Sequence, residues 1–462
     1  MFAALILARA GHEILLLERE NLELAPDVES AAASAFRMGA PQIVQPHIIM
    51  AKCRELLAEH LPDVHDALLA AGVIVAPLWT QMSPTLADHS ARPGDERLTL
   101  LMTRRSTIDW VLRKAIAVEP GVTVRSGTRV TGLLAHPGRP PHVTGVRMRD
   151  GGTIAADMVF DATGCRSAID SWLKEIGTQP PCMRRAECGI AYFSRHYRVR
   201  AGASAPGLPA TRIVAGLNEF NAGIWGADNG KIQMAVAPLA IDHRFRKVRD
   251  PEVFTAVLRT IPIYAAWLDV LEPITGVFTM GGLQNTLRRL VVDGAPVATG
   301  FHALGDSVCT TNPTLGRGLS FALWEALTLR DVLRQFGTDW TAQAMAMDAF
   351  VGEHIAPFYE EQASVDGGRM AMLRHIIFGT PAPDGVRARE DRVTYADVRA
   401  AAQFDPTAFR ALWRIHAMAQ KPLEVYTDPE VVASTRSALV ENRERLSISQ
   451  PTREELQAAL GN

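Results

Sequence analysis

Cysteine is scarce in this chain, and its positions form no metal or redox motif. The 462 residues include five cysteines, an odd number. None of them is spaced as Cys-x-x-Cys, so we predict neither a metal site nor a redox pair from them. We expect free thiols, as in a protein of the reducing cytoplasm. The five are Cys53, Cys165, Cys182, Cys188 and Cys309.

Long apolar runs and an excess of either charge are also absent. No apolar run reaches the roughly 18 residues of a transmembrane helix, and the N-terminus has no secretory signal pattern. The 48 Lys and Arg nearly balance the 50 Asp and Glu, so the net charge of −2 gives no basic footprint for nucleic acid. With 47% hydrophobic residues the chain can bury a large core, and its length favours about two or three domains. We therefore expect small-molecule partners.

The signatures of several enzyme classes are missing as well. His-Glu-x-x-His, Gly-x-Ser-x-Gly and Walker patterns do not occur, which argues against zinc proteases, serine hydrolases and P-loop NTPases. No acid–base pair stands out. Three histidines lie close to the motifs described below, and we interpret each as structural: His47, His196 and His302.

The first residues have the pattern of the second half of a β-α-β unit. Apolar residues at helical spacing begin at Phe2, and Gly11 ends this helix as a C-cap glycine would. The run over 13–17 is apolar and ends at Glu18, which is typical of a strand buried in a parallel sheet.

Farther along the chain, strand patterns alternate with helical ones. An amphipathic helix is predicted over 106–116, and short strands with a hairpin turn at 150–152 follow as a β-meander. A second hairpin turn is predicted at 229–230 between half-exposed strands. A helix is predicted over 251–271, and the chain is mainly helical from Leu319 onward.

Three predicted strands end in an acidic residue: Glu18, Asp161 and Asp306. In an open α/β sheet, ligands bind beyond the carboxyl ends of the strands. An acid at the end of the second strand commonly binds a ribose. On these fragments alone, a solvated charge at Glu18 and a plain turn over 161–164 remain alternatives.

The third of these strands opens the most specific stretch, which runs from 304 to 326. Asp306 can accept hydrogen bonds from ligand hydroxyls, and Pro313 stiffens the loop. Gly316 and Gly318 let main-chain N–H groups point at a ligand. The helix that follows presents its positively polarised N-terminus to an anion or an electron-rich ring carbonyl, such as that of a reduced flavin. The alternative is a glycine-rich loop before a structural helix.

This stretch, GDSVCTTNPTLGRGLSFALWEA over 305–326, resembles the flavin motif of the FAD-dependent aromatic hydroxylase superfamily. AGHEILLLERE over 10–20 resembles the helix end and second strand of its FAD domain, and ADMVFDATGCRSAI over 156–169 resembles its third fingerprint. RSTIDWVLRKAI over 105–116 resembles a helix whose first arginine contacts FAD. The motifs follow one another in the same order as in that superfamily, and the resemblance spans most of 2–334. Flavin halogenases and geranylgeranyl reductases are similar relatives.

The resemblance implies an α/β fold in three parts. A Rossmann-like FAD-binding domain with a β-meander would comprise 1–181 and 283–336. An antiparallel-sheet substrate-binding domain would comprise 182–282, and a helical C-terminal region 337–462. FAD would be the cofactor, with NAD(P)H as the direct or indirect reductant.

The resemblance also implies roles for individual residues. Asp306 would hold the ribityl chain of FAD, Glu18 would bind the adenosine ribose, and Pro313 would line the substrate side of the ring. Gly318, Leu319 and Ser320 would give main-chain contacts to the flavin edge. Further cofactor contacts would come from Arg105, Arg37 and Gln42 at the phosphates or ring, and from Arg19, Val130, Asp161, Gly164, Gly305 and Gly316.

The chain departs from that family at its start and in its third motif. The family opens with a strand and Gly-x-Gly-x-x-Gly, whereas Met1 aligns with the helix that follows them. We therefore expect a truncated gene model whose first strand is missing, with weaker FAD binding and exposed apolar sheet edges. The family's hydroxylases carry an Asp-Gly pair where this chain has the residues 161–164, so a separate flavin reductase is an alternative to direct reduction. The Trp-x-Trp-x-Ile-Pro motif of tryptophan halogenases does not occur.

Three functions follow from the resemblance. The first is an FAD-dependent monooxygenase that hydroxylates or epoxidises an apolar or aromatic small molecule through a flavin C4a-hydroperoxide. The second is an FAD-dependent double-bond reductase of the geranylgeranyl-reductase type. The third is a flavin-free relative without activity. In the first two the cofactor carries the chemistry, so no acid–base motif is required.

Overall fold

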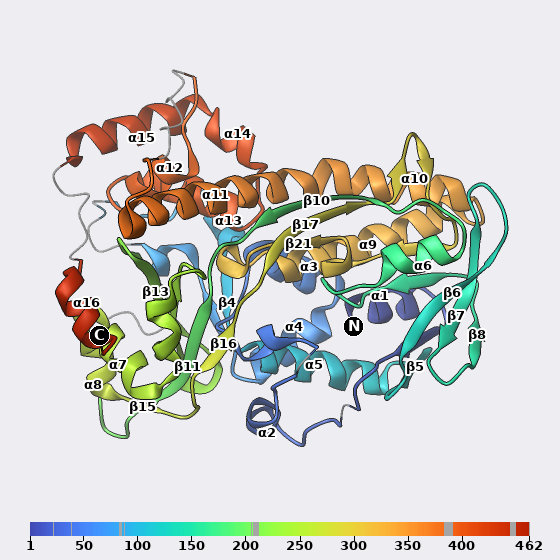
Figure 1. The fold of residues 1–462 in the computed structure, drawn as a ribbon, viewed down its shortest axis with the longest axis horizontal. Coiled ribbons are helices and arrows are strands. Elements are labelled where there is room, and N and C mark those ends of the chain that lie inside the picture. Colours follow the sequence, from blue (N-terminus) through green and yellow to red (C-terminus); the bar gives the residue numbers. More distant parts are fainter. Residues whose placement is uncertain are drawn as a thin grey trace.

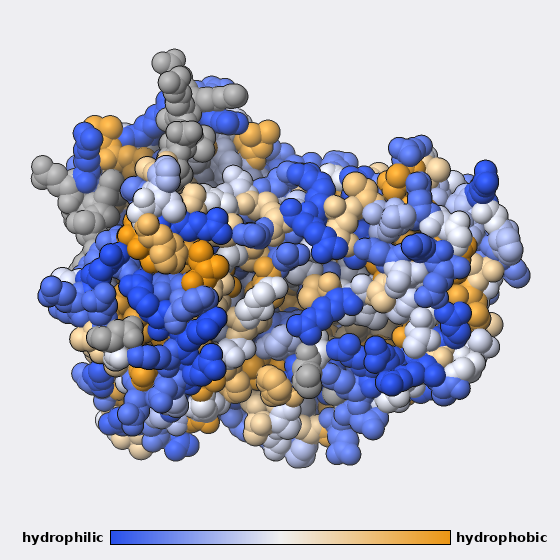
Figure 2. Space-filling view, viewed as in Figure 1, coloured by the Kyte–Doolittle hydropathy of each residue, from blue (hydrophilic) through white to orange (hydrophobic). Residues whose placement is uncertain are grey.

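A computed structural model shows an α/β protein built from several sheets and many helices (Figure 1). It confirms the predicted fold class. The structure describes residues 1–21, 23–37, 39–82, 86, 88–204, 206, 212–382, 391–443 and 450–461. Hydrophilic and hydrophobic side chains are intermingled on the face shown in Figure 2. Among the described residues, none of the helices combines the length and apolar character that crossing a bilayer requires.

Two parallel strand pairs lie in one half of the molecule. Strand β1 (Ile14–Leu17) pairs with β5 (Val122–Arg125), and β9 (Val159–Asp161) pairs with β20 (Phe301–Ala303). Within the described ranges the two pairs are separate sheets. On the first pair, Leu15 is 38% and Val124 46% exposed.

Helices pack around these pairs and bury the apolar faces that the sequence predicted. They form one core cluster with Leu5, Leu112 and Leu323 at its centre. The helices are α1 (Phe2–Arg9), α3 (Ala51–His60), α4 (Pro62–Ala70), α5 (Arg105–Val118) and α9 (Gly318–Phe336). Two shorter ones are α2 (Val28–Ala33) and α6 (Ile169–Glu175).

Two small antiparallel sheets complete this half. The predicted β-meander is β6 (Val130–His136), β7 (His142–Met148) and β8 (Thr153–Ala155). Its hairpin turn contains Gly151 at φ +88°, a backbone conformation that glycine adopts without strain. The second sheet is β2 (Ile48–Ile49), β4 (Leu100–Met102) and β3 (Ile74–Ala76), in that order.

A six-stranded antiparallel sheet dominates the other half. Its strand order is β12 (Arg212–Gly216), β13 (Phe220–Gly226), β14 (Lys231–Pro238), β11 (Tyr192–Val199) and β15 (Leu271–Pro273), with β16 (Phe278–Met280) also paired to β11. The turn predicted at 229–230 joins β13 to β14. A smaller sheet, β10 (Cys182–Glu187), β17 (Gln284–Arg289) and β21 (Cys309–Thr310), connects the two halves. The remaining pair is β18 (Val291–Val292) and β19 (Ala295–Pro296).

The helix predicted over 251–271 is two helices, α7 (Pro251–Arg259) and α8 (Pro262–Val270). The break has a physical cause, because the ring of Pro262 disfavours helical backbone at the preceding residue and removes an N–H donor. Both helices cover one face of the six-stranded sheet. Phe254 and Trp267 from the helices pack there against Ile224 of the sheet.

The C-terminal third is helical, as predicted. Helix α11 runs along the molecule, and α12 to α15 gather above the six-stranded sheet (Figure 1). Helix α16 packs instead against α7, with Leu456 in the same core cluster as the sheet. The helices are α10 (Trp340–Phe350), α11 (Ala356–Phe378), α12 (Tyr395–Ala401), α13 (Pro406–His416), α14 (Pro422–Tyr426), α15 (Pro429–Glu441) and α16 (Arg453–Ala459).

Candidate functional site

One large cavity of about 3680 Å³ connects the parallel strand pairs with the six-stranded sheet and α12. All of the site residues predicted from the sequence line it except Ser320, which is fully buried in α9. The three acidic strand ends, Glu18, Asp161 and Asp306, therefore face one common space. This arrangement is what the topology of an open α/β sheet predicts for a ligand site.

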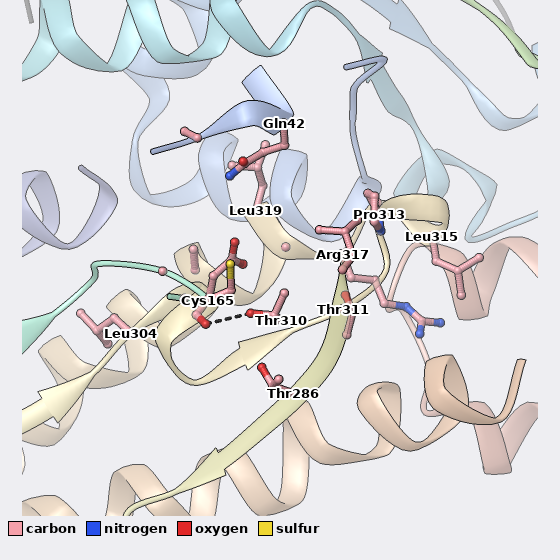
Figure 3. Close-up of a pocket in the computed structure, with 18 of the residues that line it drawn as sticks. Gln42, Cys165, Thr286, Leu304, Thr310, Thr311, Pro313, Leu315, Arg317 and Leu319 are labelled. Atoms are coloured by element: carbon pink, nitrogen blue, oxygen red, sulfur yellow. Dashed lines mark hydrogen bonds between the residues drawn. The ribbon is translucent and has the colours of Figure 1, made fainter. Parts of the chain in front are cut away.

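The loop after β20 forms one wall of the cavity, and Figure 3 shows its side chains around that wall. Gly305 and Gly316 adopt φ angles of +59° and +70°. A Cβ at Gly316 would lie 3.1 Å from Cγ and Sδ of Met50, so both the backbone angle and the space favour glycine there. The hydroxyl of Thr310 donates to the carbonyl oxygen of Asp306 at 2.9 Å, which closes the turn.

This loop is tied directly to the turn after β9. The main-chain N–H of Gly164 donates to Oγ of Ser307 at 2.9 Å. A Cβ at Gly164 would lie 4.0 Å from Cβ of Asp306. Two motifs about 140 residues apart in sequence, 161–164 and 305–318, thus form one surface.

Arg105 and Asp306 line the cavity without a side-chain partner among the described residues. Arg105 begins α5, and its guanidinium makes no hydrogen bond or ion pair with any described residue. The carboxylate of Asp306 accepts no hydrogen bond from the described residues either. Burial raises the pKa of Asp306, and Arg105 opposes that rise. Burial lowers the pKa of Arg105, and the carboxylates of Asp109 and Asp306 oppose that fall.

The adenosine side of the predicted site is an ion-pair cluster. Nη2 of Arg37 lies 3.0 Å from Oε2 of Glu18, and its Nε lies 2.6 Å from Oε2 of Glu20. Arg37 is therefore bound by two carboxylates, whereas the sequence predicted that it contacts the cofactor. The guanidinium of Arg19 lies against Gly39. The predicted roles of these residues stay predictions.

Gln42 and Val130 approach the cavity from two other elements. Gln42 lies in the short helical turn Pro41–Val44, and its side chain points toward Leu319 at the start of α9 (Figure 3). Val130 is half-buried at the start of β6. Pro313 and Leu319 line the same cavity.

Asp161 has a structural role that the sequence did not indicate. Its Oδ1 accepts hydrogen bonds from the main-chain N of Thr163 at 2.9 Å and from the hydroxyl of Thr163 at 2.7 Å. Oδ2 accepts one from Ser167. The carboxylate thereby holds its own turn in shape, since Asp side chains commonly bond to main-chain groups two residues on.

The three histidines that the sequence analysis interprets as structural all have lowered pKa values. Burial lowers the pKa of His47 to about 3, with Arg105 contributing. Burial also lowers the pKa of His196 to about 4, with Arg104 contributing, and that of His302 to about 4. All three are neutral near pH 7, so none is protonated for use as a general acid there.

Sequence reasoning missed several residues in or beneath the cavity wall. Glu325 is fully buried in α9, accepts a hydrogen bond from the N–H of Gly305 and lies under the loop. An acid within the otherwise apolar face of a predicted helix was the available signal. Tyr192 and Asn221 line the cavity from the six-stranded sheet. In a strand, successive side chains point to opposite faces, and this alternation in β11 and β13 was the signal for the direction of the Tyr192 and Asn221 side chains.

Comparison with known proteins gives relatives at low identity. No protein-family model matches the chain. Protein Rv3254 of Mycobacterium tuberculosis (strain ATCC 25618 / H37Rv) is 24% identical over 364 residues, covering 72% of this chain and 70% of that protein. The structure of PqsL, a probable FAD-dependent monooxygenase from Pseudomonas aeruginosa, is 16% identical with a TM-score of 0.56 and covers 82% of this chain and 95% of its own.

The flavin-dependent brominase Bmp2 is 15% identical with a TM-score of 0.60, and the match covers 96% of each chain. Its structure thus spans almost all of the present chain, including the C-terminal helices. At such identities the likeness concerns the fold. The chain has the fold of FAD-dependent monooxygenases and flavin-dependent halogenases, as its sequence motifs predicted.

Proposed function

We propose that the protein is an FAD-dependent monooxygenase that hydroxylates or epoxidises an apolar or aromatic small molecule. The observation that carries this proposal is the pair Arg105 and Asp306. Both are charged, both are enclosed in the cavity wall, and neither has a partner among the described residues. Unpaired charge is costly to enclose, so the arrangement fits a ligand that supplies an anion to one and hydroxyls to the other.

The residues present fit FAD. The guanidinium of Arg105 suits a diphosphate, because arginine binds phosphate oxygens through several donors. The carboxylate of Asp306 suits the hydroxyls of a ribityl chain. The first N–H groups of α9, at Gly318 and Leu319, have no partner within the helix and suit a ring carbonyl or an anionic ring edge. When bound, FAD would supply electron transfer and oxygen activation.

The reaction needs O₂ and two electrons. One oxygen atom enters the substrate and the other leaves as water, with NAD(P)H as the reductant that closes the balance. Reduction occurs either directly or through a separate flavin reductase. The role of the chain itself is to exclude water and to place the substrate beside the ring, which the small apolar residues Ala235 and Ala237 of the six-stranded sheet in the cavity wall support.

The experiment is to incubate the purified protein with FAD, remove free flavin and measure bound flavin near 450 nm. We expect bound flavin, and about 100-fold weaker binding in Asp306→Ala, because charge-assisted hydrogen bonds contribute about 1.5–3 kcal/mol each. Asp331→Ala is the matched control, since Asp331 is exposed on α9 and outside the cavity. A protein that binds no flavin, or an Asp306→Ala variant that binds it normally, contradicts the proposal.

The reaction type is tested by O₂ uptake in the presence of NAD(P)H, with and without an added flavin reductase. A monooxygenase consumes O₂ in step with oxygenated product when substrate is present. Saturation of a substrate double bond without O₂ uptake would instead identify a double-bond reductase. Flavin binding without any reductant-dependent turnover would contradict both activities.

A further inference from the structure

The two faces of the six-stranded sheet differ in side-chain size. One face carries Phe220, Ile224 and Met234, which pack against α7 and α8. The side chains on the opposite face line the cavity, and we call this surface the inner face. It is formed by Val214, Gly216, Asn221, Gly223, Trp225, Ala235 and Ala237. Small residues on the inner face leave the space that large residues fill on the other face.

One row of the inner face runs from the flavin-motif loop to α12. Gly216 pairs with Asn221, and Asn221 pairs with Ala237. The β11–β14 register then places Tyr192 beside Ala237. Neighbouring strands are about 4.8 Å apart, so the row from Tyr192 to Gly216 spans about 14 Å.

The Tyr192 end of this row lies at the loop that contains Pro313. The hydroxyl of Tyr192 donates to Oδ1 of Asn312, the residue before Pro313. Nδ2 of Asn312 donates in turn to Asp366 of α11 at 3.0 Å, and Asn285 donates to the same carboxylate at 2.8 Å. This end is therefore held rigidly against the proposed flavin site.

The other end of the row carries an unpaired cation. Nη2 of Arg399, on α12, lies 3.3 Å from the position of a Cβ at Gly216. Oδ1 of Asn221 lies 3.4 Å from the same point, so the amide and the guanidinium are neighbours. Arg399 has no hydrogen bond or ion pair with any described residue, and it lines the cavity.

The acids around Arg399 are already engaged. Asp397 on the same helix accepts from the main-chain N and the hydroxyl of Thr394 in a capping box. Other cations of this region have carboxylate partners, such as Arg410 with Asp95 at 2.8 Å. Among the described residues Arg399 is thus a cation without a partner in the cavity wall, at the end away from the flavin-motif loop.

We propose that the substrate is an elongated, largely apolar molecule with a carboxylate at one end, which Arg399 binds next to Asn221. The inference rests on the proposed function for the other end, where the reacting carbon lies beside Pro313. The planar guanidinium matches a carboxylate through two parallel N–H donors. The apolar part lies along the inner face, where Trp225 folds over Gly223.

The test uses phenylalkanoates from phenylacetate to phenylheptanoate, each paired with its uncharged primary amide. Binding is measured by calorimetry on the protein with and without FAD. We expect the longer acids of the series to bind at least tenfold more tightly than their amides, and the affinity of the acids to rise with chain length. Arg399→Gln abolishes this preference and Arg399→Lys keeps part of it, while Arg334→Gln, an exposed arginine on α9, changes nothing.

Equal binding of acids and amides, or a preference retained in Arg399→Gln, overturns the inference. Absence of saturable binding by any acid overturns it as well. Because binding is measured without turnover, on the protein with and without FAD, the result does not depend on how much flavin is bound. A protein that binds no FAD but loses acid selectivity in Arg399→Gln would contradict the proposed function and support the anion site.

Discussion

Arg104 and Arg105 are adjacent in sequence and occupy opposite electrostatic situations. Arg104 is 2% exposed and bonded to two carboxylates, with its Nη2 at 2.5 Å from Asp228 and 2.7 Å from Glu29. Arg105 faces the cavity with no partner among the described residues. The Arg104 cluster joins α5 to the β13–β14 turn, whereas Arg105 is directed at the space between strands.

The comparison distinguishes structural charge from functional charge. A buried ion is tolerated when hydrogen-bonded partners replace its hydration. An enclosed ion without such partners costs stability and marks a site where a ligand completes the arrangement. On this criterion we propose that Arg105, Asp306 and Arg399 bind ligands, whereas Arg104 and Asp228 hold the fold together.

Glu325 represents a third situation, in which a buried acid is held neutral. Burial raises its pKa to about 8; the hydrogen bond from Gly305 opposes this rise and the charge of Asp306 adds to it. The acid is therefore mostly protonated at pH 7 while it still accepts the Gly305 N–H. It braces the loop without adding a negative charge beside Asp306.

The largest effect is expected from Asp228→Ala. Asp228 is fully buried and accepts hydrogen bonds from Arg104, Thr103 and Thr107. Its removal leaves Arg104 with only the half-exposed Glu29, so the free energy of unfolding should fall by about 3–5 kcal/mol. Guanidinium chloride unfolding measures this loss.

Asp269→Ala is the control for that measurement. Asp269 is exposed and pairs with Arg259 at 2.8 Å, and such surface pairs contribute at most about 1 kcal/mol. If Asp228→Ala cost no more than Asp269→Ala, the Arg104 cluster would not be a structural element.

A smaller effect, on a different property, is expected from Arg105→Gln. FAD affinity should fall about tenfold, because one charge-assisted contact is lost. The melting temperature should stay unchanged or rise, since an enclosed charge without a partner is removed. The matched variant Arg104→Gln should lower the melting temperature clearly. Equal thermal losses in both variants would remove the distinction between the two arginines.

The smallest effect concerns the pH dependence around Glu325. The folded protein keeps the proton up to about pH 8, whereas the unfolded chain releases it near the ordinary pKa of a glutamic acid, 4.5. The folded state thus binds more protons between these values, and stability falls as pH rises through this window, by roughly 1 kcal/mol per pH unit.

Unfolding free energies of the parent and Glu325→Gln should therefore diverge between pH 6.5 and 7.5, with the glutamine variant gaining relative stability as pH rises. His47, His196 and His302 are present in both proteins, so their proton uptake on unfolding changes both curves alike and does not contribute to the divergence. Parallel pH curves would show that Glu325 is ionised in the folded protein.

Much of the local structure could be predicted because it depends on neighbouring residues. The strand that ends at Glu18, the helix from Arg105 and the turns at 150–152 and 229–230 follow from apolar periodicity and from residues that tolerate positive φ. The split between α7 and α8 was missed, although Pro262 was visible, because the apolar pattern continues across it.

The partners of the site residues could not be predicted. Asp161 bonds to its own turn, and Arg37 is bound by Glu18 and Glu20, whereas Asp306 has no partner. In the sequence, Glu18, Asp161 and Asp306 look alike as strand-end charges. Which of them is free for a ligand depends on side-chain directions set by packing across elements far apart in the chain.

The sequence by itself determined the periodic elements, the acidic strand ends and the glycine-lined start of α9, because these depend on local backbone preferences and side-chain spacing. Only the tertiary structure decided which charges are neutralised and which face the cavity, and that Arg399 lies at the far end of the row from Tyr192. The physical reason is that pairing and enclosure of a charge depend on three-dimensional proximity, which residues adjacent in sequence, such as Arg104 and Arg105, need not share.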